Sequence, residues 1–197
     1  MTAALAGYDG EPRTERHFDW VACEDRLSAA SCAAIIEAAY EFPAERAGSV
    51  GEAQHPGRRQ ATTRKLLPSD RSQWVFERLL SVASVANRRH YGLSLSGIHR
   101  PPEYVEYRPG NGRFDWHNDY SHHPTLSPRK LTLVVQLSHP SAYEGGALQT
   151  FGLGVQELPR EQGSILIFPS FVFHRVTEVT AGERRILVAW IAGAPLR

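Results

Sequence analysis

The stretch Tyr104-Val-Glu-Tyr-Arg-Pro-Gly-Asn-Gly-Arg-Phe-Asp-Trp-His117 decides how this chain is expected to fold. Aromatic and β-branched residues flank the turn-forming sequence Pro109-Gly-Asn-Gly112, and this order predicts a strand, a tight turn and a second strand. Asp119 follows His117 by two positions. Because side chains at positions i and i+2 of a strand point to the same side of a sheet, these two can bind one ion while Asn118 points away.

A further histidine that could complete this pair is His174. It follows Gly163-Ser-Ile-Leu-Ile-Phe-Pro169, a short apolar run bounded by Gly and Pro that is typical of a buried strand. Two neutral imidazoles and one carboxylate are the ligand set with which proteins hold Fe(II) on one face and leave the opposite face open. We therefore predict that His117, Asp119 and His174 are metal ligands and catalytic residues.

Arg184 is the candidate for binding an anionic cosubstrate at such a metal. Three protein ligands leave about three coordination positions, enough for a bidentate 2-oxo acid and dioxygen. The far carboxylate of a dianionic acid then needs a cation, and a planar guanidinium suits it. The strand pattern Arg184-Arg-Ile-Leu-Val-Ala-Trp190 is apolar on both faces apart from its arginines, which indicates burial on both sides. Arg185, on the opposite face, is the competing candidate.

The segment from Tyr104 to Ala192 resembles the 2-oxoglutarate and Fe(II)-dependent oxygenases of the prolyl-4-hydroxylase-like group, which includes the PKHD-type hydroxylases. The matching pieces are Tyr107-Arg-Pro-Gly110, Trp116-His-Asn-Asp119, Arg129-Lys-Leu-Thr-Leu133, Gly145-Gly-Ala-Leu148 and His174-Arg-Val-Thr-Glu-Val-Thr-Ala-Gly-Glu-Arg184. The chain departs from the common pattern at Asn118, Ala147 and Glu178. None of the three is a predicted ligand, so the departures bear on the substrate rather than on the metal.

The resemblance implies a fold, a set of site residues and an activity. The fold is α+β and mainly β: a double-stranded β-helix, jelly-roll or cupin-like, with N-terminal helices packed on the outside of the larger sheet. Fe(II) would be bound by His117, Asp119 and His174, the 5-carboxylate of 2-oxoglutarate by Arg184, and Tyr107 would line the cosubstrate pocket. The implied activity is the hydroxylation of an unactivated C–H bond by O2, coupled to decarboxylation of 2-oxoglutarate to succinate and CO2, with ascorbate as a candidate stimulant.

The side chains that flank the predicted ligands are candidates for binding the substrate. They are Arg113, Trp116, Asn118 and Tyr120. A chain of 197 residues with a net charge of +1 favours a small molecule, a free amino acid or a peptide residue as substrate, and it provides no field for binding nucleic acid. We expect a monomer or a homodimer.

The sequence leaves other assignments open. His122 and His123 are rival metal ligands. One alternative function is a catalytically inert cupin-like domain that binds a metal, which the presence of Arg184 disfavours. Another is a metal-dependent hydrolase, which needs a general base near the ion. Asp115 is the candidate base, because strand alternation would place it on the same face as His117.

Composition fits one catalytic domain. At 42% hydrophobic, 197 residues are enough for one sizeable core. No apolar run approaches the length that a membrane span needs. With two cysteines and no signal-peptide pattern, we predict a cytoplasmic protein.

The expected organisation is a flexible start over residues 1–16 and a single oxygenase domain over 17–197, with helical support at 28–91 and a catalytic β core at 94–192. We predict a helix over 29–40 with Ser28 as N-cap, and a second helix that begins near a capping box of Asp70 and Gln73 and runs to about Tyr91. Residues 44–60 are expected to form a mobile loop and a possible lid over the site. Strands are predicted at 18–21, 94–100, 103–108, 113–117, 130–138, 147–151, 154–158, 164–168, 172–178 and 184–192.

Overall fold

The computed structural model describes residues 19–47, 59–110, 112–120, 129–152 and 154–194. Within them the chain forms an eight-stranded sheet, in which β1-β12-β8-β15-β6-β4-β2 are neighbours and β5 pairs with β15. Its strands are β1 Val21–Ala22, β2 Glu45–Arg46, β4 Thr62–Lys65, β5 Leu95–Ile98, β6 Glu103–Tyr107, β8 Arg129–Gln136, β12 Ile165–Pro169 and β15 Arg184–Gly193.

A five-stranded sheet with the order β11-β10-β13-β7-β3 faces the first, and β9 and β14 form a separate pair. The strands are β3 Arg59–Gln60, β7 Arg113–His117, β9 Tyr143–Gly145, β10 Leu148–Phe151, β11 Val155–Glu157, β13 Phe173–Val176 and β14 Val179–Gly182. The strand pairings are antiparallel. The predicted fold, a double-stranded β-helix, is confirmed.

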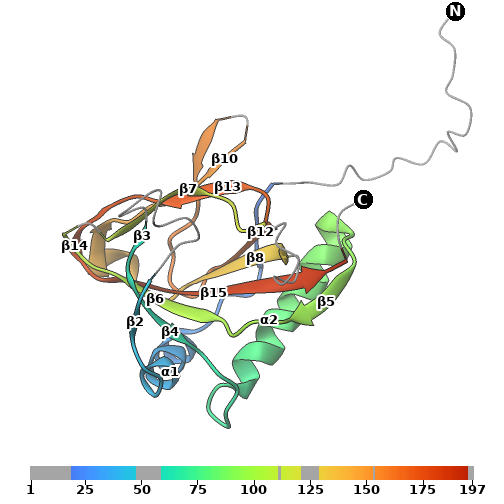
Figure 1. Ribbon diagram of the computed structural model, residues 1–197, viewed down its shortest axis with the longest axis horizontal. Coiled ribbons are helices and arrows are strands. Elements are labelled where there is room, and N and C mark those ends of the chain that lie inside the picture. The colour runs from blue at the N-terminus through green and yellow to red at the C-terminus, as the bar shows by residue number, and fades with distance from the viewer. Residues whose placement is uncertain (1–18, 48–58, 111, 121–128, 153, 195–197) are drawn as a thin grey trace, which may run out of the picture.

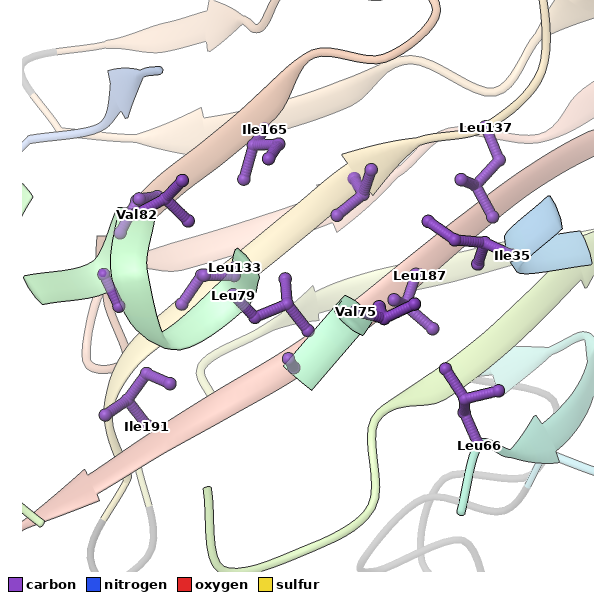
Figure 2. Packing of buried hydrophobic residues seen from close by; sticks show 14 of the residues in the cluster. Ile35, Leu66, Val75, Leu79, Val82, Leu133, Leu137, Ile165, Leu187 and Ile191 are labelled. Carbon is purple, nitrogen blue, oxygen red and sulfur yellow. The ribbon is translucent and has the colours of Figure 1, made fainter. Parts of the chain in front are cut away.

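Figure 1 shows the layers of the molecule: helices α1 (Ala29–Tyr40) and α2 (Gln73–Ala86) lie on one side of the large sheet, and β7 and β13 of the small sheet lie on the other. Two apolar clusters hold these layers together. The outer cluster joins the helices to the large sheet, and the inner cluster lies between the two sheets. In the outer cluster Ile35 and Leu79 meet Leu133 and Leu187, as Figure 2 shows. The helices therefore brace the outer face of the large sheet, as predicted.

β15 is the strand that both clusters share. Leu187, Ala189 and Ile191 face the helices, whereas Ile186 and Val188 face the small sheet. The predicted alternation, with burial on both sides, is thus confirmed. It directs Arg184 into the space between the sheets.

The helix boundaries follow local chemistry, with one correction. Ser28 caps α1 and accepts a hydrogen bond from the backbone N–H of Ser31. The predicted capping box of Asp70 and Gln73 is wrong: the N-cap of α2 is Ser72, whose hydroxyl donates to the carbonyl of Leu67. Because that hydroxyl also accepts from Ser69 N–H, it fixes the turn before the helix rather than the helix itself.

α2 continues into a π-helical turn, Asn87–Tyr91, which ends at Gly92 with a φ of 62°. Glycine adopts this left-handed conformation without steric cost, which is why the helix stops where the sequence predicted. In the described part of the chain, no helix is both long enough and apolar enough to cross a membrane.

Short strands account for the main differences from the predicted elements. The ends of the expected loop over residues 44–60 are β2 and β3, and β4 follows within the segment assigned to helical support. β9 and β14 were not predicted. Such segments are strands because distant partners pair with them; for example, β3 pairs with β7 and β4 with β6. The middle of the expected lid, and the flexible start at 1–16, lie outside the described residues.

Candidate metal centre and cosubstrate pocket

His117, Asp119 and His174 come together between the sheets. One ligand atom from each lies within 4.8 Å of the others. Nε2 of His174 is 3.5 Å from Oδ2 of Asp119, and the centroids of the two imidazole rings are 4.1 Å apart. Both histidines are buried, and the Asp119 side chain is only 9% exposed. Three converging donors in a shielded place are what a metal ion with open coordination positions requires.

Strand pairing positions these three residues. His117 on β7 and His174 on β13 are direct partners in the small sheet. Asp119 lies just beyond β7, where the backbone N–H groups of Asp119 and Tyr120 both donate to the carbonyl of Ser170, at 2.8 and 2.9 Å. This double hydrogen bond fastens the end of β7 to the turn before β13. The carboxylate is therefore held beside both imidazoles.

A β-bulge in β7 overturns the expectation for Asp115. The pairing shifts between His174↔His117 and Val176↔Phe114, so one more residue is present on β7 than on β13. As a result Phe114, not Asp115, shares the inner face with His117, and the two rings stack with centroids 3.4 Å apart. Asp115 is exposed, and its carboxylate accepts from the N–H of Trp116. It is not directed at the triad.

Backbone carbonyls orient both imidazoles. Nδ1 of His117 lies 2.7 Å from the carbonyl oxygen of Asp115, and Nδ1 of His174 lies 3.0 Å from that of Val172. Because a carbonyl can only accept, each Nδ1 carries the proton and each Nε2 keeps its lone pair. Rings fixed in this tautomer are ready to bind a metal through Nε2.

Asp119 has its own supporting groups. The Thr132 hydroxyl donates to Oδ2 at 2.9 Å and lies 3.1 Å from the Ser170 hydroxyl. Burial raises the pKa of Asp119, but the positive charges that His174 and His117 carry when protonated, together with the guanidinium of Arg129, outweigh it, so this pKa lies below its ordinary value. The carboxylate is therefore ionised and suited to bind a cation.

Arg184 lies deeper in the same interior and is only 1% exposed. Its Nη2 donates to Oε1 of Gln136 at 3.0 Å, and Gln136 is oriented by a bond from Nε2 to the carbonyl of Pro159. Nε and Nη1 are buried and have no hydrogen-bond partner among the described residues. Burial lowers the pKa of Arg184, and the nearby hydroxyls of Tyr143 and Tyr107 offset this only in part.

Tyr107, Gly146 and Arg185 define the surroundings of Arg184. Tyr107 is its cross-strand partner, 2% exposed, with its ring centroid 5.6 Å from the guanidinium carbon. A Cβ at Gly146 would lie 3.0 Å from Cδ of Arg184, so glycine at this position lets the arginine pass. Arg185 faces the other way, half-buried, and pairs with Glu183 at 2.6 Å. A buried cation without an ion pair among the described residues needs an anion.

The remaining candidates have more varied positions. Arg113 is half-buried on β7, and Asn118 is exposed, as its strand position predicted. Trp116 packs edge-on to Phe151 at 5.9 Å, under the Arg175 guanidinium at 4.6 Å. The backbone N–H of Tyr120 donates to the carbonyl of Ser170 at 2.9 Å. Their roles in binding substrate stay predictions, and the rival ligands His122 and His123 lie outside the described residues.

Some residues near the site escaped the sequence analysis. Thr132 and Gln136 carried a sequence signal that was missed. Both are polar residues within an apolar run, and because they are four positions apart on a strand, they point to the same face. Arg59 on β3 carried none, and Arg129 at the start of β8 opens one of the pieces that resemble the family but was assigned no role. Arg59 is 9% exposed, bonds to Glu103 at 3.0 Å and lies over the Phe114 ring, whereas Arg129 reaches Asp119.

Residues 102–192 match the model of the 2OG-Fe(II) oxygenase superfamily. The matched segment is just under half of the chain, and over this segment the chain resembles that superfamily. A PKHD-type hydroxylase from Parvibaculum lavamentivorans is 45% identical over 62 residues, which are 31% of this chain and 28% of that relative. The chain thus matches less than a third of the length of this curated oxygenase-like relative.

Two solved structures share the fold of this segment and of the helices before it. A Pseudomonas putida prolyl-4-hydroxylase superposes with a TM-score of 0.66 at 19% identity, covering 89% of this chain and 93% of that one. A Trichoplax adhaerens prolyl hydroxylase, in complex with a hypoxia inducible factor peptide fragment, superposes with a TM-score of 0.68 at 15% identity, covering 88% and 83%.

The superfamily name implies Fe(II) and 2-oxoglutarate, and the described residues fit both. Two Nε2 lone pairs and one ionised carboxylate form the donor set suited to Fe(II). The buried Nε and Nη1 of Arg184, which have no hydrogen-bond partner among the described residues, leave N–H donors for a carboxylate.

Proposed function

We propose that this protein is a non-haem Fe(II)- and 2-oxoglutarate-dependent dioxygenase. The observation that carries the proposal is the combination of the His117, Asp119 and His174 triad with the buried guanidinium of Arg184, whose Nε and Nη1 have no hydrogen-bond partner among the described residues. The triad alone would suit many metal proteins. A buried cation with two unsatisfied donors in the same interior supports the binding of a dianionic cosubstrate.

The chemistry that Fe(II) and 2-oxoglutarate supply together is the activation of O2, coupled to conversion of the keto acid to succinate and CO2. His117, Asp119 and His174 would hold the ion, with Thr132 and two backbone carbonyls fixing their orientation. Arg184 and Tyr107 would hold the far carboxylate of the cosubstrate. The rings of Phe114 and Phe168, packed against the imidazoles, would exclude water from the inner side.

We infer that the reaction is the hydroxylation of an unactivated C–H bond in a small molecule, a free amino acid or a peptide residue. The PKHD-type relative is named a hydroxylase, and the Trichoplax adhaerens structure holds a peptide. No observation on the described residues specifically favours the two alternatives, a metal-dependent hydrolase and an inert metal-binding domain. Asp115, the candidate base for a hydrolase, is exposed and engaged with its own neighbour, and the unpaired Arg184 would have no purpose in an inert metal-binding domain.

An anaerobic titration tests the proposal. Adding 2-oxoglutarate to the Fe(II)-loaded protein should produce a weak visible charge-transfer band, because the keto acid then binds the ferrous ion directly. Asp119→Ala should abolish this band and succinate formation, whereas Asp115→Ala, the matched control, should retain both. If the wild-type protein shows no band, or if Asp119→Ala forms succinate at the wild-type rate, the proposal is wrong. Loss of activity in Asp115→Ala with no band in the wild type would favour a hydrolase.

A further inference from the structure

Arg129 is a second arginine at the triad, and it is on the side away from Arg184. It begins β8, and its guanidinium lies 3.8 Å above the ring of Trp190 on β15. Nη1 is 3.6 Å from Oδ1 of Asp119, and the side chain is 20% exposed. Stacking on an indole holds a guanidinium in one orientation while leaving its N–H groups available. Arg129 is therefore a fixed cation next to the metal ligands, with some access to solvent.

The charges around Arg129 do not balance. The groups that act on its guanidinium include the carboxylates of Asp119 and Glu103 and the arginines Arg100 and Arg59. Glu103 already pairs with Arg59 at 3.0 Å, so these two charges cancel. Asp119 is thus the principal anion that faces Arg129.

Binding of the metal removes that partner. In the proposed holoenzyme the charges of the ferrous ion, Asp119, Arg184 and the 2-oxoglutarate dianion cancel one another. Arg129, with the exposed Arg100 near it, then has no remaining counter-charge among the described residues. A mostly desolvated guanidinium without a counter-charge is costly, and an anionic ligand would relieve that cost.

We propose that Arg129 binds a carboxylate of the substrate, so that the substrate is a small molecule with a free carboxylate, such as a free amino acid, rather than a residue within a peptide chain. This inference rests on the proposed oxygenase function. A guanidinium binds carboxylate through two parallel hydrogen bonds, which fixes the direction of the ligand as well as its charge. The 3.6 Å between Arg129 and Asp119 places that anchor within the length of an amino acid from the triad.

The competing role for Arg129 is to orient Asp119 as a metal ligand. Thr132 already performs that task, since its hydroxyl donates to Oδ2 of Asp119 at 2.9 Å. The 3.6 Å contact from Arg129 is longer than a hydrogen bond. The two roles predict different losses: an orienting residue supports metal affinity, whereas a substrate anchor supports affinity for acids only.

Binding measurements separate these roles without requiring turnover. The protein is loaded with Mn(II), which does not support the reaction, and with 2-oxoglutarate. It is then titrated calorimetrically with a panel of free L-amino acids and, in parallel, with the corresponding amino-acid amides. The variants are Arg129→Gln, which removes the charge, and Arg129→Lys, which keeps it but loses the bidentate geometry. Arg88→Gln, on the π-helical turn and bonded to Ser84, is the matched control.

We expect at least one free acid to bind the wild-type protein more tightly than its amide does. In Arg129→Gln the Kd of that acid should rise by on the order of 10- to 100-fold, the loss of one charge-assisted hydrogen-bonded pair. The Kd of the Arg129→Lys variant should lie between those of the wild type and of Arg129→Gln, and the Kd of the Arg88→Gln variant should equal that of the wild type. The affinities for Mn(II) and 2-oxoglutarate should change by less than about threefold in every variant.

Two outcomes would overturn the inference. One is a panel in which no free acid binds more tightly than its amide. The other is a loss of Mn(II) affinity in Arg129→Gln as large as any loss of acid affinity, which would make Arg129 a positioning residue for Asp119. Failure of the proposed function is distinguishable, because the wild-type protein would then bind no 2-oxoglutarate in the presence of metal. Thermal unfolding of each variant reports whether it folds.

Discussion

Arg184 and Arg185 are neighbours in the chain with opposite environments. Arg184 is buried between the sheets, with two nitrogens unsatisfied by the described residues, whereas Arg185 pairs with Glu183 at the outer edge. The strand register, fixed by the apolar residues that follow, decides which of the two faces inward. Substituting each arginine in turn can therefore test which of the two binds the cosubstrate.

Arg184→Gln should raise the KM for 2-oxoglutarate by on the order of 10- to 100-fold, because a charge-assisted contact to its distal carboxylate is lost. Arg185→Gln should leave this KM unchanged. Succinate release at varied 2-oxoglutarate concentrations measures both. Since Arg184→Gln also removes a buried charge, the cosubstrate-free variant should lose less than about 1 kcal/mol of unfolding free energy. An equal effect of the two substitutions would contradict the assignment.

At the scale of elements, β15 links the helical layer to the site. Its outward residues pack against α1 and α2, and its inward residues place Arg184 and Trp190 along the interior. Figure 2 shows Leu187 near Val75 and Ile35, so this contact ties the strand to both helices. The helices thus support the site indirectly, by holding the strand that carries two of its side chains.

Leu187→Ala should lower the free energy of unfolding by about 2–5 kcal/mol, because a fully buried leucine is replaced by a cavity between sheet and helices. Leu80→Ala on α2 is the control: Leu80 is 41% exposed, and its truncation should cost no more than roughly 0.5 kcal/mol. Urea unfolding followed by circular dichroism measures both. Similar losses for the two variants would mean that the helices do not pack on β15 as described.

At the scale of the whole molecule, the candidate site brings together residues from both sheets. The triad draws on β7, on the segment after it and on β13, while Arg184 and Arg129 come from the large sheet. An ion bound here would link β7, the segment after it and β13, and a 2-oxoglutarate held by both the ion and Arg184 would join them to the large sheet. A ligand that binds only the folded chain stabilises it by mass action.

Mn(II) with 2-oxoglutarate should accordingly raise the Tm. At ligand concentrations about 100 times Kd the gain is about 2.7 kcal/mol, which corresponds to roughly 5–10 °C for a domain of this size. Calorimetry with and without EDTA measures the shift, and chelation should reverse it. Asp119→Ala should show no metal-dependent shift. A shift that persists in this variant would place the metal elsewhere.

The resemblance to a known family implied the fold class, whereas the residues themselves predicted the two helices, most of the long strands and the three metal-ligand candidates that the structure brings together. The helices and strands follow from local spacing and apolar periodicity, which are present in each segment. The alternation in β15 is the clearest case. Side chains at every second position of a strand point to the same face, so Arg184 faces the inside of the sandwich together with Ile186 and Val188.

Only the tertiary structure decided the rest. The bulge that turns Asp115 outward and stacks Phe114 on His117 arises from the pairing of β7 with β13. β2, β3 and β4 exist because distant strands offer them backbone hydrogen-bond partners. Arg129 meets Asp119 and Trp190 across three segments of chain. Such features depend on long-range contacts, and no local pattern encodes where separate segments converge.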